Sequence, residues 1–298
     1  MKVSILEFYQ HILPSNGINA LAYRSPGENF FRHCLFESLD EMAKKSIMLD
    51  GQKFDVFMAC ASYQQGFYKD TLGRKHFRTA DNANYVKSFW FDIDCDQIKA
   101  EQGKGYLSVN DALIALDTFC RTIGLPIPTI ILSGGGLHCY FVLDAEISKS
   151  QWVPVAKKLK VLTHQFQLLA DDSRTADIAS ILRPVGTHNW KPERMGKEVE
   201  LYHLSKAISF DTFSELINAR YKHIQPEEVQ RPGKPRPDFL ETDENKKRIK
   251  AALKLLDPNC DRAFWRDICF ALHSLGWLCA KDLAKSWSRG DLYDADSR

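Results

Sequence analysis

The stretch SFWFDIDCD, residues 88–96, places three aspartates on alternate positions after a run of aromatic and apolar residues. In a β-strand, residues two apart point to the same side, so Asp92 and Asp94 project together from one face. Two neighbouring carboxylates repel each other and are costly to desolvate, and a divalent cation removes that cost. Their hard oxygen ligands suit Mg²⁺ or Mn²⁺. The alternative is a strand end whose aspartates are solvated or cap a following turn, and for Asp96 we expect the solvated state.

A second group of polar residues lies in ILSGGGLHCYFVL, residues 131–143, where three glycines join two β-like runs. Glycines permit a tight turn and let a ligand approach the backbone closely. Ser133 closes the first run and His138 opens the second. A hydroxyl, the amides of Gly135 and Gly136 and an imidazole therefore meet at one turn, which predicts a phosphate cradle. An ordinary hairpin with a half-exposed histidine is the alternative.

The third segment, DDSRTADIASILRPVGTHNWK at residues 171–191, runs from acidic residues into a basic loop rich in Gly, Asn and Pro. Arg183 can bind a phosphate through two parallel hydrogen bonds, and Lys191 can do so as a point charge. The alternative is a solvated connection with scattered charges.

The composition is that of a globular protein without extreme charge. The chain has 298 residues, a formal net charge of +2, and eight cysteines without a Cys-x-x-Cys pair or a Cys/His zinc spacing. Overall charge therefore gives no argument for nucleic-acid binding, and no zinc site is expected. The cysteines are typical of reduced core residues in an intracellular protein. Without a signal peptide or a membrane-spanning apolar run, we expect a soluble protein with no membrane partner.

Strand-like and helix-like stretches alternate over residues 1–222, which predicts a mixed α+β domain. The expected strands are 55–63, 88–94, 128–133, 137–143 and 199–204, and the expected helices are 108–124, 150–170 and 209–222. The first of these helices has Ser108 and Asp111 as a capping pair and Gly124 as its end. Residues 223–247 lose the periodicity and gain proline and charge, which predicts a linker.

An Asp-x-Asp strand, a Ser-to-His glycine turn and an acidic residue before ILRPVGTHNWK together resemble the three motifs of the archaeo-eukaryotic primase superfamily. The resemblance covers roughly residues 50–205. It implies an α+β catalytic core with an RRM-like mixed sheet and flanking helices.

The same resemblance implies roles for individual residues. Asp92 and Asp94 would bind two catalytic ions, Mg²⁺ or Mn²⁺, and His138 would contact the phosphates of the incoming nucleotide. For the third metal ligand the order of preference is Asp172, Asp177 and Asp171. The other nucleotide-binding candidates are Ser133, Gly135, Gly136, Arg183 and Lys191.

Two further segments have expected roles. The basic segment GRKHFR, residues 73–78, precedes the catalytic strand, and its Arg74 and Arg78 are candidates for template binding, with a solvated loop as the alternative. Residues 248–298 predict three short helices and resemble the module that commonly follows primase domains in phage and plasmid replication proteins. We expect this module to continue beyond the chain given, as part of a longer protein.

The function implied by the resemblance is a DNA primase-polymerase that makes or extends primers on single-stranded DNA of a phage, plasmid or other mobile element. Its substrates would be dNTPs or NTPs, its partner a replicative helicase in cis or in trans, and its location the cytoplasm of a bacterium or a phage-infected host. A metal-dependent nuclease is one rival, but it gives no reason for the turn between Ser133 and His138. A non-catalytic replication-initiator protein that binds DNA is the other, and it would not need all three acidic motifs.

Overall fold

The computed structural model of the chain describes residues 3–69, 73, 75–194, 196–224 and 240–288. The chain divides into two compact units, Met1–Pro226 and Glu227–Arg298. All eight cysteines lie within the described ranges, and none of them forms a disulfide. Within those ranges, too, every helix is too short or too polar to cross a membrane.

Helices and strands alternate through the first unit. Its helices are α1 (Ile5–Ile12), α2 (Leu39–Gly51), α3 (Gln97–Glu101), α4 (Val109–Ile123), α5 (Lys149–Gln165), α6 (Asp172–Thr175) and α7 (Phe210–Ile224). Its strands are β1 (Asn19–Arg24), β2 (Arg32–Phe36), β3 (Asp55–Ala59), β4 (Ala61–Tyr63), β5 (Tyr68–Lys69), β6 (Lys75–His76), β7 (Ala83–Asp94), β8 (Thr129–Leu132), β9 (Gly136–Ser148), β10 (Ile181–Leu182), β11 (His188–Asn189), β12 (Lys197–Glu198) and β13 (Glu200–His203).

The strands form a five-stranded sheet of order β13-β8-β9-β7-β4 and a four-stranded sheet of order β10-β3-β1-β2, besides the ribbons β11-β12 and β5-β6. The named strands pair antiparallel throughout. Helices and antiparallel sheets in one unit confirm the predicted α+β class.

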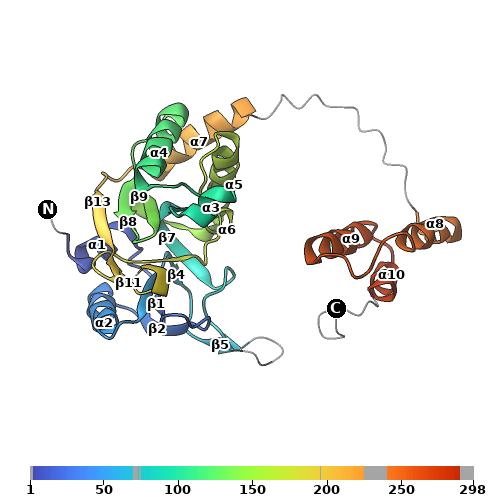
Figure 1. Cartoon of the computed structure of the whole chain (residues 1–298), viewed down its shortest axis with the longest axis horizontal. Coiled ribbons are helices and arrows are strands. Elements are labelled where there is room, and N and C mark those ends of the chain that lie inside the picture. Colours follow the sequence, from blue (N-terminus) through green and yellow to red (C-terminus); the bar gives the residue numbers. More distant parts are fainter. Residues whose placement is uncertain (1–2, 70–72, 74, 195, 225–239, 289–298) are drawn as a thin grey trace. The chain divides into compact units, whose positions relative to one another are not determined.

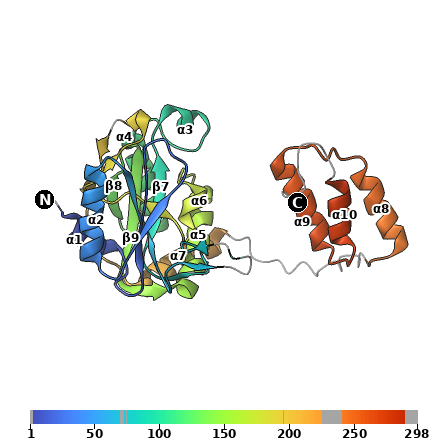
Figure 2. The same cartoon turned by 90° about the horizontal axis from the view of Figure 1, so that it is seen from below.

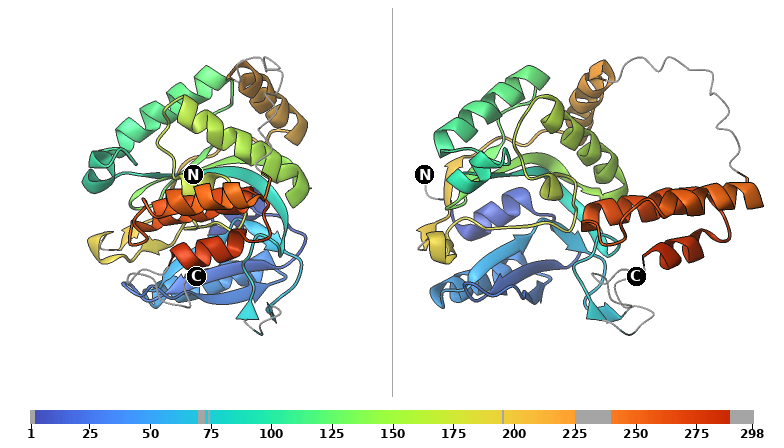
Figure 3. Two further views of the ribbon diagram at one scale, coloured as in Figure 1. Left: turned by 90° about the vertical axis from the view of Figure 1, so that its right-hand side faces the viewer. Right: turned by 45° about the vertical axis from the view of Figure 1, so that its right-hand side comes forward.

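The five-stranded sheet is covered by α4, α5 and α7 on one face, and the four-stranded sheet lies on its other side (Figure 1; Figure 3). Aromatic side chains fill the helix-covered face, where Phe91 of β7 meets Phe119 of α4 and Phe141 of β9 meets Phe213 of α7. Helices α1 and α2 pack side by side, and α2 also packs on the four-stranded sheet (Figure 2). Because side chains alternate along a strand, the even-numbered residues at the end of β7 face away from α4.

The ends of α4 agree with the capping residues predicted from the sequence, whereas one predicted strand is divided in the structure by long-range pairing. Ser108 accepts a hydrogen bond from the Asp111 amide at 3.1 Å, and Gly124 ends α4 in the left-handed conformation, as predicted. The single strand expected over 55–63 is instead two strands in different sheets. The break falls at Cys60, whose amide donates to the Ser180 carbonyl at 3.1 Å.

The second unit contains α8 (Asp243–Leu253), α9 (Arg262–Ser274) and α10 (Ala280–Trp287), which match the three helices expected there. Its core is made by Leu253, Leu272, Trp277, Ala280, Leu283 and Trp287. The range predicted as a linker, 223–247, includes the last residues of α7 and the first of α8, and 225–239 lie outside the described residues.

Candidate active site

The end of β7 and the start of β9 bring the first two motifs together. In the antiparallel register Asp92 lies opposite His138 and Asp94 lies opposite Gly136. Asp92 and Asp94 share one face, as the alternation predicted, and Nε2 of His138 lies 3.7 Å from Oδ1 of Asp92. The β-ladder therefore sets the carboxylates and the imidazole side by side.

The glycine turn between β8 and β9 packs directly on the end of β7. A Cβ on Gly136 would overlap the main-chain oxygen of Ile93, so only glycine fits at that position. The Gly135 carbonyl accepts a hydrogen bond from the Cys95 amide at 2.9 Å, and the Ser133 amide donates to the Gly136 carbonyl at 2.9 Å. The turn is thus fastened both to itself and to the strand that carries the aspartates.

A cavity of about 220 Å³ opens beside these residues. Its acidic lining is Asp92 and Asp94, and Ser133, Gly135 and His138 line it from the hairpin. Its cationic lining is Arg24, Arg174, Arg183, Lys191 and Arg194. Gly136, a predicted nucleotide-binding residue, does not line this cavity and instead borders a separate hollow with Cys95 and Lys197.

Sequence reasoning missed three of the cationic side chains, Arg24, Arg174 and Arg194. Arg174 lies within the third segment and Arg194 follows it closely, and their position beside predicted site residues was a usable signal. Arg24 comes from β1, far from every motif, and only the pairing of β1 with β3 brings it to the cavity.

The surroundings of Asp92 disfavour the charged form of its carboxylate. Desolvation, together with the negative charges of Asp94 and Asp171, raises the pKa of Asp92 to about 7. The negative charge of Asp94 is offset by Lys99, because Nζ of Lys99 lies 3.1 Å from Oδ2 of Asp94. A cation bound to this pair would neutralise the negative charge of the two carboxylates, which burial and mutual repulsion disfavour.

His138 is neutral in this environment. Burial, together with the positive charge of Arg183, lowers the pKa of His138 to about 3. A neutral imidazole carries one N–H donor, so it can donate a single hydrogen bond to a phosphate oxygen.

Among the three acidic candidates of the third motif, Asp171 lies nearest to the pair. Its amide donates to the Asp92 carbonyl at 2.7 Å, and its carboxylate is close enough to raise the pKa of Asp92. Asp172, the preferred candidate from sequence, is half-exposed and bonds to Nε2 of His164 at 2.7 Å. Asp177 accepts the Ala179 amide at 3.0 Å within its own turn.

The donor set at the pair fits a hard divalent cation. Within the described part of the chain no three His, Cys, Asp or Glu side chains form a complete metal-binding group. Mg²⁺ in nucleotide-dependent enzymes is commonly held by one or two carboxylates, with water and substrate phosphates filling the other positions. Asp92 and Asp94 beside a cationic cavity have the composition that such a shared site requires.

A second, larger hollow also borders Asp94. This groove of about 830 Å³ is lined by Asp94, Lys99, Lys104, His164, Gln167, Asp171, Asp172 and their neighbours. Gln167 has a φ of +54°, an uncommon conformation for a residue other than glycine. Asp94 therefore borders both hollows.

The remaining predicted residues have structural contacts. Arg78 donates from Nη1 to the Ala179 carbonyl, and Arg74 lies outside the described residues. Asp96 is not simply solvated as expected, because it accepts the Lys99 amide at 2.8 Å as the N-cap of α3 and pairs with Arg194 at 3.0 Å.

No family model matches the chain, and no curated protein matches it. Its structure is similar to the AEP domain of the primase-polymerase of cyanophage S-2L, at 11% identity and a TM-score of 0.44, covering 68% of this chain and 90% of that one. It is also similar to primase RepB′, at 14% identity and a TM-score of 0.46, covering 91% and 75%. The catalytic domain of primase RepB′ in complex with initiator DNA gives 12% identity and a TM-score of 0.43, covering 71% and 90%. At TM-scores below 0.5, the function of this chain has to be inferred from its own site residues.

Proposed function

We propose that this chain is a DNA primase-polymerase of the archaeo-eukaryotic primase type that transfers nucleotides to a 3′-hydroxyl on a single-stranded DNA template. One observation supports it above all others. A carboxylate pair, Asp92 and Asp94, borders a small cavity whose other walls carry arginine and lysine side chains. Polymerisation needs this combination, because the carboxylates hold cations while the basic groups hold a triphosphate.

The residues of the cavity have complementary tasks. Arg183 and Lys191 neutralise the triphosphate, and His138 donates one hydrogen bond to it. In the reaction, the 3′-oxygen forms a bond to the α-phosphorus while the bond to pyrophosphate breaks. Catalysis then depends mainly on positioning and on stabilising negative charge. Asp92 and Asp94 would hold the divalent cations, with Asp171 in place of Asp172 as the third ligand. When bound, those cations would neutralise the triphosphate and favour ionisation of the 3′-hydroxyl.

The larger groove that also borders Asp94 is the place we propose for the strand that carries the 3′-hydroxyl. Attack and departure are in line, so the two reactants approach the metal-binding pair from opposite sides. Lys99 and Lys104 line this groove and supply positive charge for a nucleic-acid backbone.

A metal-dependent nuclease is the second candidate, since it also needs clustered carboxylates. The small basic cavity favours the polymerase, because a nuclease acting on a continuous strand has no triphosphate to neutralise. The non-catalytic alternative gives no reason for keeping Asp92 where burial and two carboxylates oppose its charge.

The deciding experiment incubates the full chain with a labelled primer on a template, dNTPs and Mn²⁺. Extension supports the proposal, shortening supports the nuclease, and binding without turnover supports the non-catalytic alternative. Asp92→Ala should lower extension roughly a thousandfold or more while the protein stays folded. Asp171→Asn should lower extension far more than the neighbouring Asp172→Asn, and the reverse order would return the third ligand to Asp172.

A further inference from the structure

Two acidic residues outside the three motifs lie directly behind the basic wall of the cavity. We infer that Asp50 and Asp55 are positioning residues, which hold the phosphate-binding side chains of the cavity in place. This inference rests on the proposed function. Asp50 lies near the end of α2 and Asp55 begins β3, so a turn of only a few residues separates them.

Asp55 holds the arginine of the third motif. Its side chain is fully buried, and Oδ1 accepts a hydrogen bond from Nη2 of Arg183 at 2.9 Å. The Arg183 guanidinium is also 4.3 Å from the centre of the Phe57 ring, so a carboxylate and an aromatic face fix its plane. Arg24 lies at 3.8 Å from Oδ2 of the same carboxylate. Asp55 therefore balances two cavity arginines that would otherwise repel each other.

The same carboxylate also holds the loop that carries Lys191. Oδ1 of Asp55 accepts the main-chain amide of Trp190 at 3.0 Å. From Asp50, Oδ1 accepts the His188 amide at 2.7 Å and the Trp190 indole N–H at 3.0 Å. Oδ2 of Asp50 lies 2.8 Å from Nδ1 of His188. The backbone just before Lys191 is thus fixed by two carboxylates.

The turn between the two acidic residues carries conformational cost. Asp50 lies in the last turn of α2, where the helix dipole disfavours a negative charge. Lys53 adopts a φ of +63°, and its Nζ lies 5.9 Å from the centre of the Trp190 ring. Left-handed backbone at a residue other than glycine and a carboxylate at a helix C-terminus are both unfavourable locally. Both features place side chains, those of Asp50 and Lys53, against the loop at 188–190 and so help to fix it.

The test is a pair of charge-removing variants in the full chain, Asp55→Asn and Asp50→Asn. Two properties are measured, the KM and kcat for dNTP in primer extension and the affinity for inorganic tripolyphosphate without DNA. Asp55→Asn should raise KM and weaken tripolyphosphate binding about tenfold or more, because a charged hydrogen-bond partner of Arg183 is lost. Asp50→Asn should act more weakly and through the loop alone.

Double variants separate positioning from general stability. The effect of Asp55→Asn on tripolyphosphate affinity should largely disappear in an Arg183→Gln background, and that of Asp50→Asn in a Lys191→Ala background. Ser46→Ala is the matched control, since it removes a buried hydrogen bond to Tyr9 away from the cavity and should leave KM unchanged.

The readout without DNA keeps this inference distinct from the proposed function. If the chain extends no primer but Asp55→Asn still weakens tripolyphosphate binding, the polymerase proposal fails and the positioning role stands. Unchanged KM and tripolyphosphate affinity in both variants would overturn the positioning role. Effects that simply add to those of Arg183→Gln and Lys191→Ala would also overturn it. The same holds if the wild-type chain binds neither dNTP nor tripolyphosphate. If Asp55→Asn does not fold, Asp50→Asn with its Lys191→Ala partner decides on the same criteria.

Discussion

Asp92 has the most perturbed carboxylate of the site, and its protonation links the site to the stability of the metal-free protein. The pKa of Asp92 is about 7 in the folded chain against an ordinary value of 3.8, so the folded state binds the proton more tightly than the unfolded state. Stability is therefore lost as the pH rises from about 4 to about 7, and the loss is complete above 7. Asp92→Asn removes this penalty.

We expect Asp92→Asn to raise the melting temperature of the metal-free protein at pH 8 by several degrees, at about 2–4 °C per kcal/mol for a domain of this size. At pH 4 the difference should vanish, because Asp92 is then protonated in the folded wild-type chain. Thermal melts in chelator at both pH values provide the measurement. An equal gain at pH 4 and pH 8 would mean that the stabilisation has another cause.

His138 is expected to act on the nucleotide rather than on the template. His138→Ala should raise the KM for dNTP by roughly 10- to 150-fold, the range that corresponds to 1.5–3 kcal/mol for a charge-assisted hydrogen bond. Template affinity, measured by fluorescence anisotropy, should change little. His203→Ala is the control, because His203 is exposed on β13 and lines neither the small cavity nor the larger groove. Equal losses of template and nucleotide binding would identify His138 as a structural residue.

At the scale of elements, the junction of β7 with β9 determines the site geometry. Gly136 lies opposite Asp94, and a side chain there would overlap the Ile93 carbonyl. Gly136→Ala should therefore push the two strands apart, lower the free energy of unfolding by about 2–4 kcal/mol and remove extension activity. Gly51→Ala is the matched control, since its Cβ would meet open space at the end of α2. Urea unfolding of both variants tests this, and equal stabilities would contradict the packing argument.

The parts of the site that sequence could predict are those specified by local periodicity. The shared face of Asp92 and Asp94 follows from strand alternation, and the cap at Ser108 follows from its side-chain chemistry. The bond between Asp55 and Arg183 joins residues 128 positions apart, and no local pattern specifies it. The position of Asp171 next to Asp92 likewise depends on how α6 packs beside β7. Long-range packing therefore supplied what the motifs left open.

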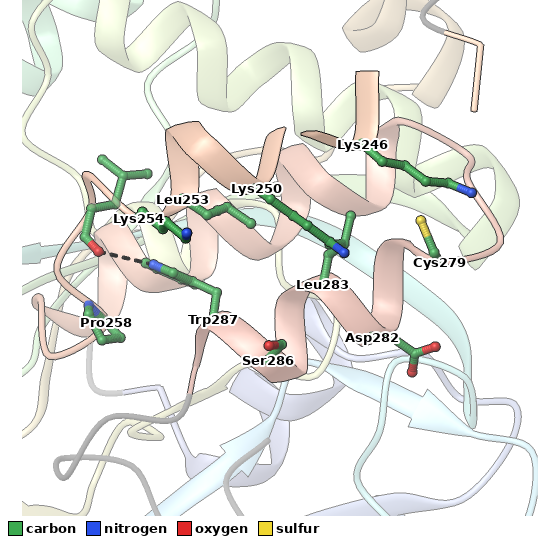
Figure 4. Close-up of a pocket in the computed structure, with 11 residues that line it drawn as sticks. Lys246, Lys250, Leu253, Lys254, Pro258, Cys279, Asp282, Leu283, Ser286 and Trp287 are labelled. Carbon is green, nitrogen blue, oxygen red and sulfur yellow. Dashed lines mark hydrogen bonds between the residues drawn. The ribbon is translucent and has the colours of Figure 1, made fainter. Parts of the chain in front are cut away.

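At the scale of the whole molecule, each unit has a hydrophobic core of its own. The second unit also carries a groove of about 690 Å³ between α8 and α10 (Figure 4). Lys246 and Lys250 of α8 and Lys254 at its C-terminal cap line this groove. Leu253, Leu283 and Trp287 contribute its apolar lining. Basic side chains over an aromatic and apolar surface suit single-stranded nucleic acid. This surface is the part of the second unit that we expect to contact the template.

The two units are expected to have different functions, extension in the first and primer initiation with the help of the second. A chain ending after residue 226 keeps every proposed metal and nucleotide ligand, so it should still extend an existing primer. Starting a new primer requires ordering two free nucleotides and a template without a duplex. Because this entropy cost is larger than that of extension, primer initiation depends on additional contacts. The shortened chain should therefore lose most synthesis on unprimed DNA.

In the full chain, Lys250→Glu with Lys254→Glu should reproduce the loss of synthesis on unprimed DNA. Lys281→Glu, which lies on α10 outside the groove lining, should not. Gel assays with labelled nucleotides on primed and unprimed templates separate the two activities. Equal survival of both activities in the shortened chain would make the second unit a connector only. Loss of both from a folded protein would place part of the active site in that unit.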